Sequence, residues 1–205
     1  MKVKTVHHLS ILFISLLLMF MGSESAISET TAVKTQLILL GTGTPNADPD
    51  RSGPSLAIVV GDTSYIVDFG PGVVRRAASL SKNRGDSFEA LNPENLKIAF
   101  LTHLHSDHTA GYADLILTPW VLGRSEPLKV FGPKGLKRMT EKIVDAYNED
   151  ISYRIQGLEP ANENGWKVKV NEIDEGLIYT DDRVQVTAFK ISHGTWEHAF
   201  GYKFV

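Results

Sequence analysis

The sequence predicts an α/β (α+β) fold in a single domain. Short β-rich runs recur along the chain, and segments compatible with helices lie between them. This alternation is typical of sheets covered by helices. The length of 205 residues, with 42% hydrophobic and 22% charged residues, suits one globular domain and excludes a disordered or fibrous chain.

Nine runs are expected to form strands, because they are short and rich in apolar or β-branched residues. In chain order they are residues 36–40, 55–60, 63–68, 97–101, 128–131, 167–170, 177–180, 184–189 and 199–205. The dipeptide Gly61-Asp62 between the second and third runs predicts a hairpin. In the last run, Phe200, Tyr202 and Phe204 fall on one side of the strand.

Two segments between these runs are expected to be helices. Residues 73–82 follow the motif Gly70-Pro71-Gly72, which ends a strand. Residues 134–147 carry apolar side chains at the spacing of one helical stripe, at Leu136, Met139, Ile143 and Tyr147.

The N-terminus predicts a cleaved signal peptide. Lys2 and Lys4 precede an uncharged, largely apolar run from Leu9 to Met21, and small residues follow as far as Ala26. A membrane anchor is the alternative, but a spanning helix needs about 20 apolar residues and this run is shorter. We therefore expect a signal peptide at residues 1–25, one domain at 26–205, a periplasmic or secreted protein, and no membrane span after cleavage.

Composition limits the chemistry. The chain has no Cys, which excludes disulfides, thiolate metal ligands and Cys nucleophiles, so any metal must be held by His and carboxylates. The net charge of −3 argues against bulk electrostatic binding to nucleic acid.

Residues 102–111 concentrate the candidate ligands. His103, His105, Asp107 and His108 lie within six residues. If the preceding strand continues through His105, its period of two places His103 and His105 on the same face, where both reach one ion. Asp107 and His108 follow at the turn and can face a second ion. Nitrogen and carboxylate ligands suit zinc, and also manganese or iron.

The pattern His103-x-His105-x-Asp107-His108 resembles the signature of the metallo-β-lactamase superfamily. Further short motifs resemble that family, and in particular its branch of ribonuclease Z enzymes and related secreted arylsulfatases. They are Asp68-Phe69-Gly70, Ile191-Ser192-His193-Gly194, Gly41-Thr42-Gly43-Thr44-Pro45, Phe131-Gly132-Pro133 and Phe200-Gly201-Tyr202.

The resemblance implies a four-layer αββα sandwich, with the site at the loop ends of two facing sheets. It implies that His103, His105 and His193 hold a first metal ion, and that Asp107 and His108 belong to a second. It also implies that Asp68 orients a metal-bound His, as outer carboxylates do in many metal sites.

The chain departs from the family pattern at its end. Complete members have a later Asp that bridges two ions and a later His, and nothing after His193 matches either. The sequence also stops within a strand pattern, so we expect only the N-terminal part of the sandwich and one or two bound ions. Without a following layer, the side with Phe200, Tyr202 and Phe204 is expected to be exposed.

The resulting functional hypothesis is a secreted metal-dependent hydrolase. A metal-activated water would attack a phosphodiester or sulfate ester, with Asp107 steering the nucleophile or shuttling a proton. The expected partner is a small ester, nucleic acid is disfavoured by secretion, and a homodimer is left open. The alternatives are a mononuclear iron enzyme of the persulfide dioxygenase type and an inactive metal-binding remnant.

The signal-peptide hypothesis predicts export. In a Gram-negative host, protein with a C-terminal tag should be recovered from the periplasm or medium, shortened by about the length of a signal peptide. Edman sequencing or intact mass measures the new N-terminus. Full-length protein in the cytoplasm, still starting at Met1, would contradict the hypothesis.

Overall fold

The computed structural model describes residues 34–158 and 161–205. The expected signal peptide, residues 1–25, lies outside the described residues. Among the residues that are described, no helix is long and apolar enough to cross a membrane.

The larger sheet has six strands in sequence order. Its first three strands form antiparallel pairs, which confirms the hairpin at Gly61-Asp62, and the pairs from β3 to β6 are parallel. The strands are β1 (Thr35–Gly41), β2 (Ser55–Val60), β3 (Thr63–Val67), β4 (Ile98–Phe100), β5 (Leu128–Gly132) and β6 (Val168–Glu172). The carboxyl ends of β3, β4 and β5 therefore meet at one edge.

The second sheet has three antiparallel strands, in the order β7-β8-β9. They are β7 (Gly176–Thr180), β8 (Gln185–Lys190) and β9 (Phe200–Phe204). All nine expected strands are present, each with bounds within a few residues of the expected run.

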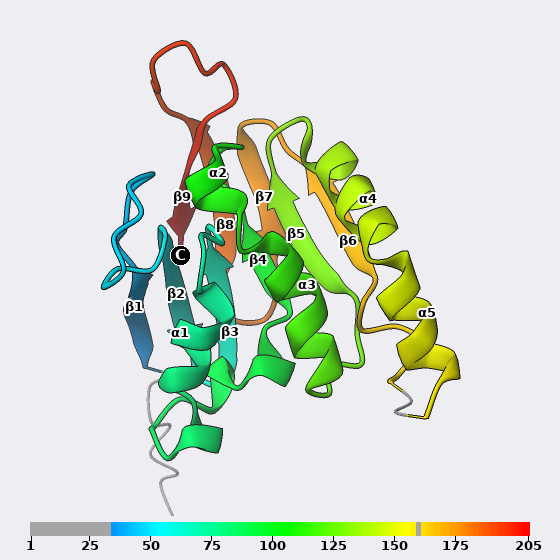
Figure 1. Cartoon of the computed structure of the whole chain (residues 1–205). Helices are drawn as coiled ribbons and strands as arrows, with labels where there is room; N and C mark the ends of the chain where they lie inside the picture. Colours follow the sequence, from blue (N-terminus) through cyan, green and yellow to red (C-terminus); the bar gives the residue numbers. More distant parts are fainter. Residues whose placement is uncertain (1–33, 159–160) are drawn as a thin grey trace, which may run out of the picture. The chain divides into compact units, whose positions relative to one another are not determined.

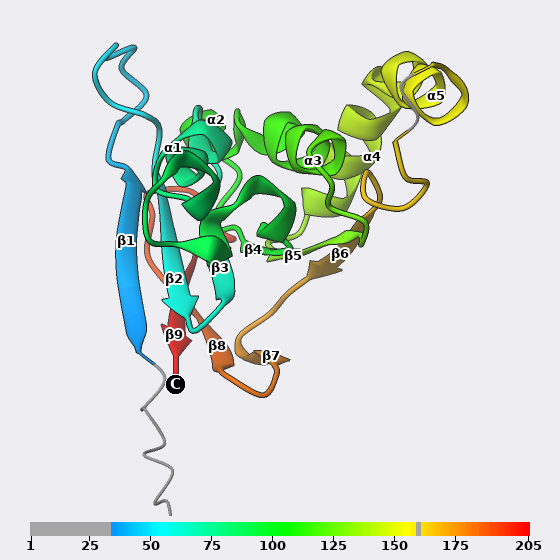
Figure 2. The same cartoon turned by 90° about the horizontal axis from the view of Figure 1, so that it is seen from below.

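The helices cover one face of the six-stranded sheet, and the three-stranded sheet lies on the other face (Figures 1 and 2). The α-helices are α1 (Val73–Ser79), α2 (Ser106–Thr109), α3 (Tyr112–Val121), α4 (Leu136–Ala146) and α5 (Asn148–Gln156). Three 3₁₀ turns lie between α1 and β4: η1 (Lys82–Arg84), η2 (Glu89–Leu91) and η3 (Pro93–Asn95). The mixed α/β class is confirmed. The described residues form three layers of the expected αββα sandwich, namely the helices and both sheets.

Two hydrophobic cores hold the layers together. One lies between the helices and the larger sheet and includes Ile66, Leu101 and Trp120. The other lies between the two sheets, where the Phe100 ring stacks on Phe131 with centroids 5.2 Å apart.

The expectation that Phe200, Tyr202 and Phe204 would be exposed is wrong. Phe200 is only 1% exposed, and Tyr202 and Phe204 pack against the core between the sheets. The Phe204 ring lies 5.5 Å from Phe100, centroid to centroid. The six-stranded sheet covers this side of β9.

A buried arginine compensates for a proline inside α3. Pro119 has no backbone N–H, so it cannot bond the carbonyl of Leu115 one turn earlier. Arg124 Nη1 donates to that carbonyl at 3.0 Å, and the guanidinium also bonds the carbonyls of Leu96, Ile116 and Gly165. Arg124 is 1% exposed, and burial lowers its pKa to about 10, so it remains charged at neutral pH. The charge is therefore held by four carbonyl oxygens.

This arrangement predicts a large stability effect. Arg124→Met should lower the free energy of unfolding by about 3–5 kcal/mol, because several buried carbonyls lose their donor at a cost of about 1–3 kcal/mol each when fully unsatisfied. In a Pro119→Ala background the loss should be about 1–2 kcal/mol smaller, because the new N–H at position 119 can bond the Leu115 carbonyl. Urea denaturation of the four proteins measures both losses. Equal losses in the two backgrounds would contradict the link between Arg124 and Pro119.

Candidate metal centre

The candidate ligands lie at the carboxyl edge of the larger sheet, but not on a strand. β4 ends at Phe100, so the condition under which a strand's period would place His103 and His105 on one face is not met. The Thr102 N–H donates to the Asp68 carboxylate at 2.8 Å, where a continuing strand would bond a neighbouring carbonyl. His103 and His105 therefore lie on the loop between β4 and α2.

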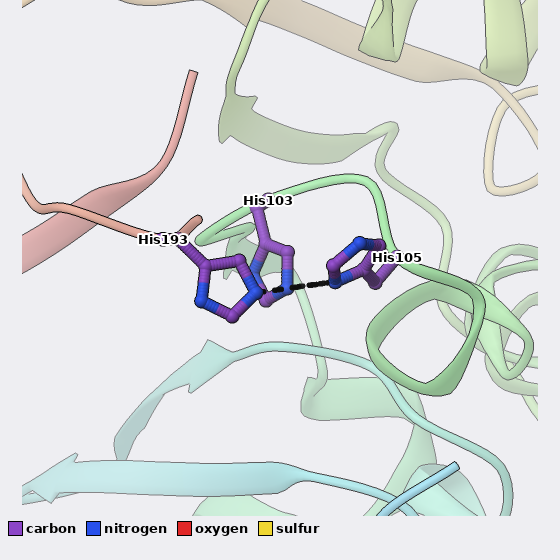
Figure 3. A group of neighbouring side chains, drawn as sticks. All are labelled: His103, His105 and His193. Carbon is purple, nitrogen blue, oxygen red and sulfur yellow. Dashed lines mark hydrogen bonds between the residues drawn. The ribbon is translucent and has the colours of Figure 1, made fainter. Parts of the chain in front are cut away.

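Three histidines nevertheless converge (Figure 3). His103 Nε2 lies 2.9 Å from His105 Nδ1, and His193 Nε2 lies 3.2 Å from the same nitrogen. One ligand atom from each of the three residues falls within 4.8 Å of the others. His193 comes from the loop between β8 and β9, so the group joins the two sheets.

The three nitrogens fit the coordination of a single ion. A tetrahedral site with metal–nitrogen bonds of about 2.0–2.1 Å separates its ligands by about 3.3–3.4 Å, which is close to the spacings of His105 Nδ1 from the other two nitrogens. Three imidazoles and no sulfur suit zinc, manganese or iron. His103, His105 and His193 can thus hold a divalent ion.

His103 is the buried member of the group, at 5% exposure. Burial lowers its pKa to about 4, and the neighbouring His108 and His193 act in the same direction. The ring is therefore neutral near pH 7, which is the form that binds metal. His105 is half-buried, and His193 is exposed.

Asp107 and His108 lie together on α2, beside the three-histidine group. His108 Nε2 is 3.6 Å from an Asp107 carboxylate oxygen, and the His108 ring is 4.2 Å from the His103 ring, centroid to centroid. Neither residue belongs to the three-residue ligand group. They form a separate pair of donors on the same side of the site.

Asp68 connects these parts. It is 7% exposed, it directly follows β3, and its φ of 60° is the one positive value among the described non-glycine residues. Its carboxylate accepts a hydrogen bond from His108 Nδ1 at 2.8 Å. Burial lowers the pKa of His108, but the bond and the charge of Asp68 outweigh that effect and raise it.

Thr102 was not identified as a site residue from the sequence. Its hydroxyl donates to Asp68 at 2.9 Å and lies 2.9 Å from His103 Nδ1. Since the hydroxyl hydrogen points to Asp68, the oxygen accepts from His103 Nδ1–H, which leaves His103 Nε2 free as a ligand. The one available signal was the position of Thr102 directly before His103.

Trp196 is the second residue that was missed. Its ring lies 4.4 Å from the His105 ring and 6.2 Å from the His103 ring, centroid to centroid. No short motif includes it, and only its place three residues after His193 could have indicated a role.

Comparison with known proteins agrees with this geometry. The model of the Metallo-beta-lactamase superfamily matches residues 48–194, a range that contains every candidate ligand and Asp68. Ribonuclease Z of Mycobacterium marinum is 33% identical over 171 residues, which is 82% of this chain and 58% of that protein. Ribonuclease Z of Mycobacterium bovis (strain BCG / Pasteur 1173P2) is 39% identical over 123 residues, or 58% of this chain and 41% of that protein. The chain thus spans about half the length of these curated relatives.

Solved structures show the same fold. The short form of human tRNase Z superimposes with a TM-score of 0.62 at 21% identity, over 82% of this chain and 63% of that one. The metallo-beta-lactamase fold protein YhfI from Bacillus subtilis gives 0.59 at 16% identity, over 84% and 58%. With the family match covering more than half of its length, this chain belongs to the metallo-beta-lactamase superfamily.

Proposed function

We propose that this protein is a metal-dependent hydrolase that cleaves phosphodiester bonds. The observation that carries the proposal is the convergence of His103, His105 and His193 within 4.8 Å, beside the Asp107–His108 pair. The names of the matched relatives, ribonuclease Z, favour a phosphodiester over a sulfate ester. The expected export and the net charge of −3 favour a small diester over transfer RNA.

The metal is proposed to be zinc, held by the three histidines. When bound, such an ion lowers the pKa of a water molecule to ~7 and polarises the oxygen that gains charge. The neutral His103 and the hydrogen bond from Thr102 to Asp68 keep one ligand nitrogen oriented toward the site.

Asp107 is proposed to act as the general base and general acid of the reaction. Its carboxylate can accept a proton as water adds to phosphorus, and can return it to the oxygen that leaves when the P–O bond breaks. His108, whose Nδ1 is held by Asp68, places its Nε2 3.6 Å from that carboxylate. Both side chains project from α2, so one short helix positions the proton-transfer group next to the ligands.

The ligand set predicts the metal content. The purified protein should carry close to one firmly held ion per chain, because among residues 34–158 and 161–205 a single group offers three ligands. His103→Ala or His193→Ala should remove it, whereas Asp107→Ala should weaken binding less. Elemental analysis after gel filtration measures the content, and His198→Ala, in the same loop as His193, is the matched control.

Three outcomes would count against this assignment. Two firmly bound ions per chain would mean that the Asp107–His108 pair is completed in another way. No bound ion would contradict the metal centre. Tightly bound iron in place of zinc would favour the persulfide dioxygenase alternative over hydrolysis.

The proposal also predicts chelator-sensitive hydrolysis. The zinc-loaded protein should cleave bis(p-nitrophenyl) phosphate slowly, and faster than p-nitrophenyl sulfate, and a chelator should stop the reaction. Asp107→Asn should lower kcat by about 10²–10⁴-fold, the usual contribution of a general acid or base, while the metal content stays unchanged. Asp182→Asn, on the exposed turn before β8, should leave kcat unchanged. Preference for the sulfate, or turnover that survives the chelator, would overturn the proposal.

A further inference from the structure

The loop that carries His193 contacts the site through two side chains. It joins β8 to β9, and the hydrogen bond from Ile191 N to the Ala199 carbonyl, 3.0 Å long, closes its base. Figure 1 shows this loop extending beyond the ends of both sheets. His193 is exposed, and its ring lies 4.4 Å from the His103 ring and 5.1 Å from the His105 ring, centroid to centroid.

A tight turn couples His193 to Trp196. The His193 carbonyl accepts a hydrogen bond from Trp196 N at 3.0 Å, which is the bond that closes a four-residue β-turn. Gly194, second in the turn, has φ of 59°, a conformation that favours glycine. The turn therefore fixes the backbone of His193 relative to that of Trp196.

Both of these side chains touch His105. His193 Nε2 lies 3.2 Å from His105 Nδ1, and the half-buried Trp196 ring is tilted against the His105 ring at 4.4 Å. His105 belongs to the loop that Asp68 and α2 anchor, so it offers a fixed surface. The indole is the larger of the two contacts, since an aromatic side chain buries more area than any other kind.

We propose that Trp196 is the positioning residue for the third metal ligand: its indole, packed on His105, sets the turn that holds His193 within coordination distance. The proposal rests on the metal centre of the proposed function. It concerns metal affinity, and Trp196 itself donates no ligand.

Metal titration of the full chain tests this role. Trp196→Ala should weaken Zn²⁺ affinity by about 10- to 100-fold, the usual effect of losing a residue that orients a ligand. Trp196→Phe keeps an aromatic ring on His105 and should stay close to the wild-type affinity. Thr195→Ala, an exposed neighbour in the same turn, is the matched control. Competition with a chromogenic chelator measures each affinity.

The variant Gly194→Ala changes the same turn but keeps the contact between Trp196 and His105. A Cβ at position 194 would meet open space, so any effect must act through the strained φ. Weaker Zn²⁺ binding is expected here as well. This variant keeps the proposal testable if Trp196→Ala disturbs folding, which circular dichroism would reveal.

The decisive comparison is made in a His193→Ala background. If Trp196 acts through His193, then Trp196→Ala should cause no further loss of the weak residual Zn²⁺ affinity that His103 and His105 provide once His193 is absent. An equal loss in both backgrounds, or a wild-type affinity for Trp196→Ala alone, would overturn the proposal. A His193→Ala protein that binds Zn²⁺ as well as wild type would instead overturn the metal centre, which separates the two failures.

Fluorescence provides a readout that is independent of activity. Ni²⁺ has an open d shell and quenches a nearby indole, whereas Zn²⁺ does not. Ni²⁺ should quench the wild-type protein, and the quenching should largely vanish in Trp196→Phe but persist in Trp166→Phe, whose ring lies beside β6 and α4. Persistence of the quenching in Trp196→Phe would contradict the placement of Trp196 against the site.

Discussion

The site depends on the hydrogen bonds that the Asp68 carboxylate accepts from Thr102 and His108. It takes the Thr102 N–H away from the sheet and so ends β4 before the histidines. It bonds His108 directly and reaches His103 through the Thr102 hydroxyl. Asp68 has a positive φ, which is strained for a residue other than glycine. Its contacts with Thr102 and His108 stabilise this conformation. The imidazoles of His103 and His108 and the start of α2 therefore share one anchor.

The close approach of α2 to the Asp68 turn needs glycine. A Cβ on Gly70 would come within 2.5 Å of the Asp107 carbonyl, and one on Gly111 within 2.3 Å of the Gly70 carbonyl. In return, Phe69 N bonds the His108 carbonyl at 2.9 Å, and Gly111 N bonds the Phe69 carbonyl at 3.0 Å. Backbone contacts thus place the Asp107–His108 pair, and side-chain contacts orient it.

Much of this arrangement was predictable from local patterns. Apolar runs located the strands of the described residues, and one helical stripe located α4. The density of histidines pointed to His103 and His105, and the family resemblance added His193, which the structure brings to them. The sequence patterns did not show which segments pack against each other in the folded protein. Alternation showed that Phe200, Tyr202 and Phe204 share a side, but could not show that the other sheet covers it. α5 was missed because it follows α4 directly and buries only Ile151. His103 and His105 meet because their loop turns, and not because of a strand's period.

The three histidines of the candidate metal centre differ in how firmly the protein holds them. His103 is buried and bonded, and His105 lies against it on an anchored loop, whereas His193 sits on an exposed turn. An ion that bridges such elements must supply the free energy that orders the looser one. In a chain that spans about half of its relatives' length, the core between the sheets is nevertheless closed by its own aromatic residues. Aromatic packing thus joins the two sheets, and an ion held by His103, His105 and His193 would add a link between the β8–β9 loop and the edge of the larger sheet.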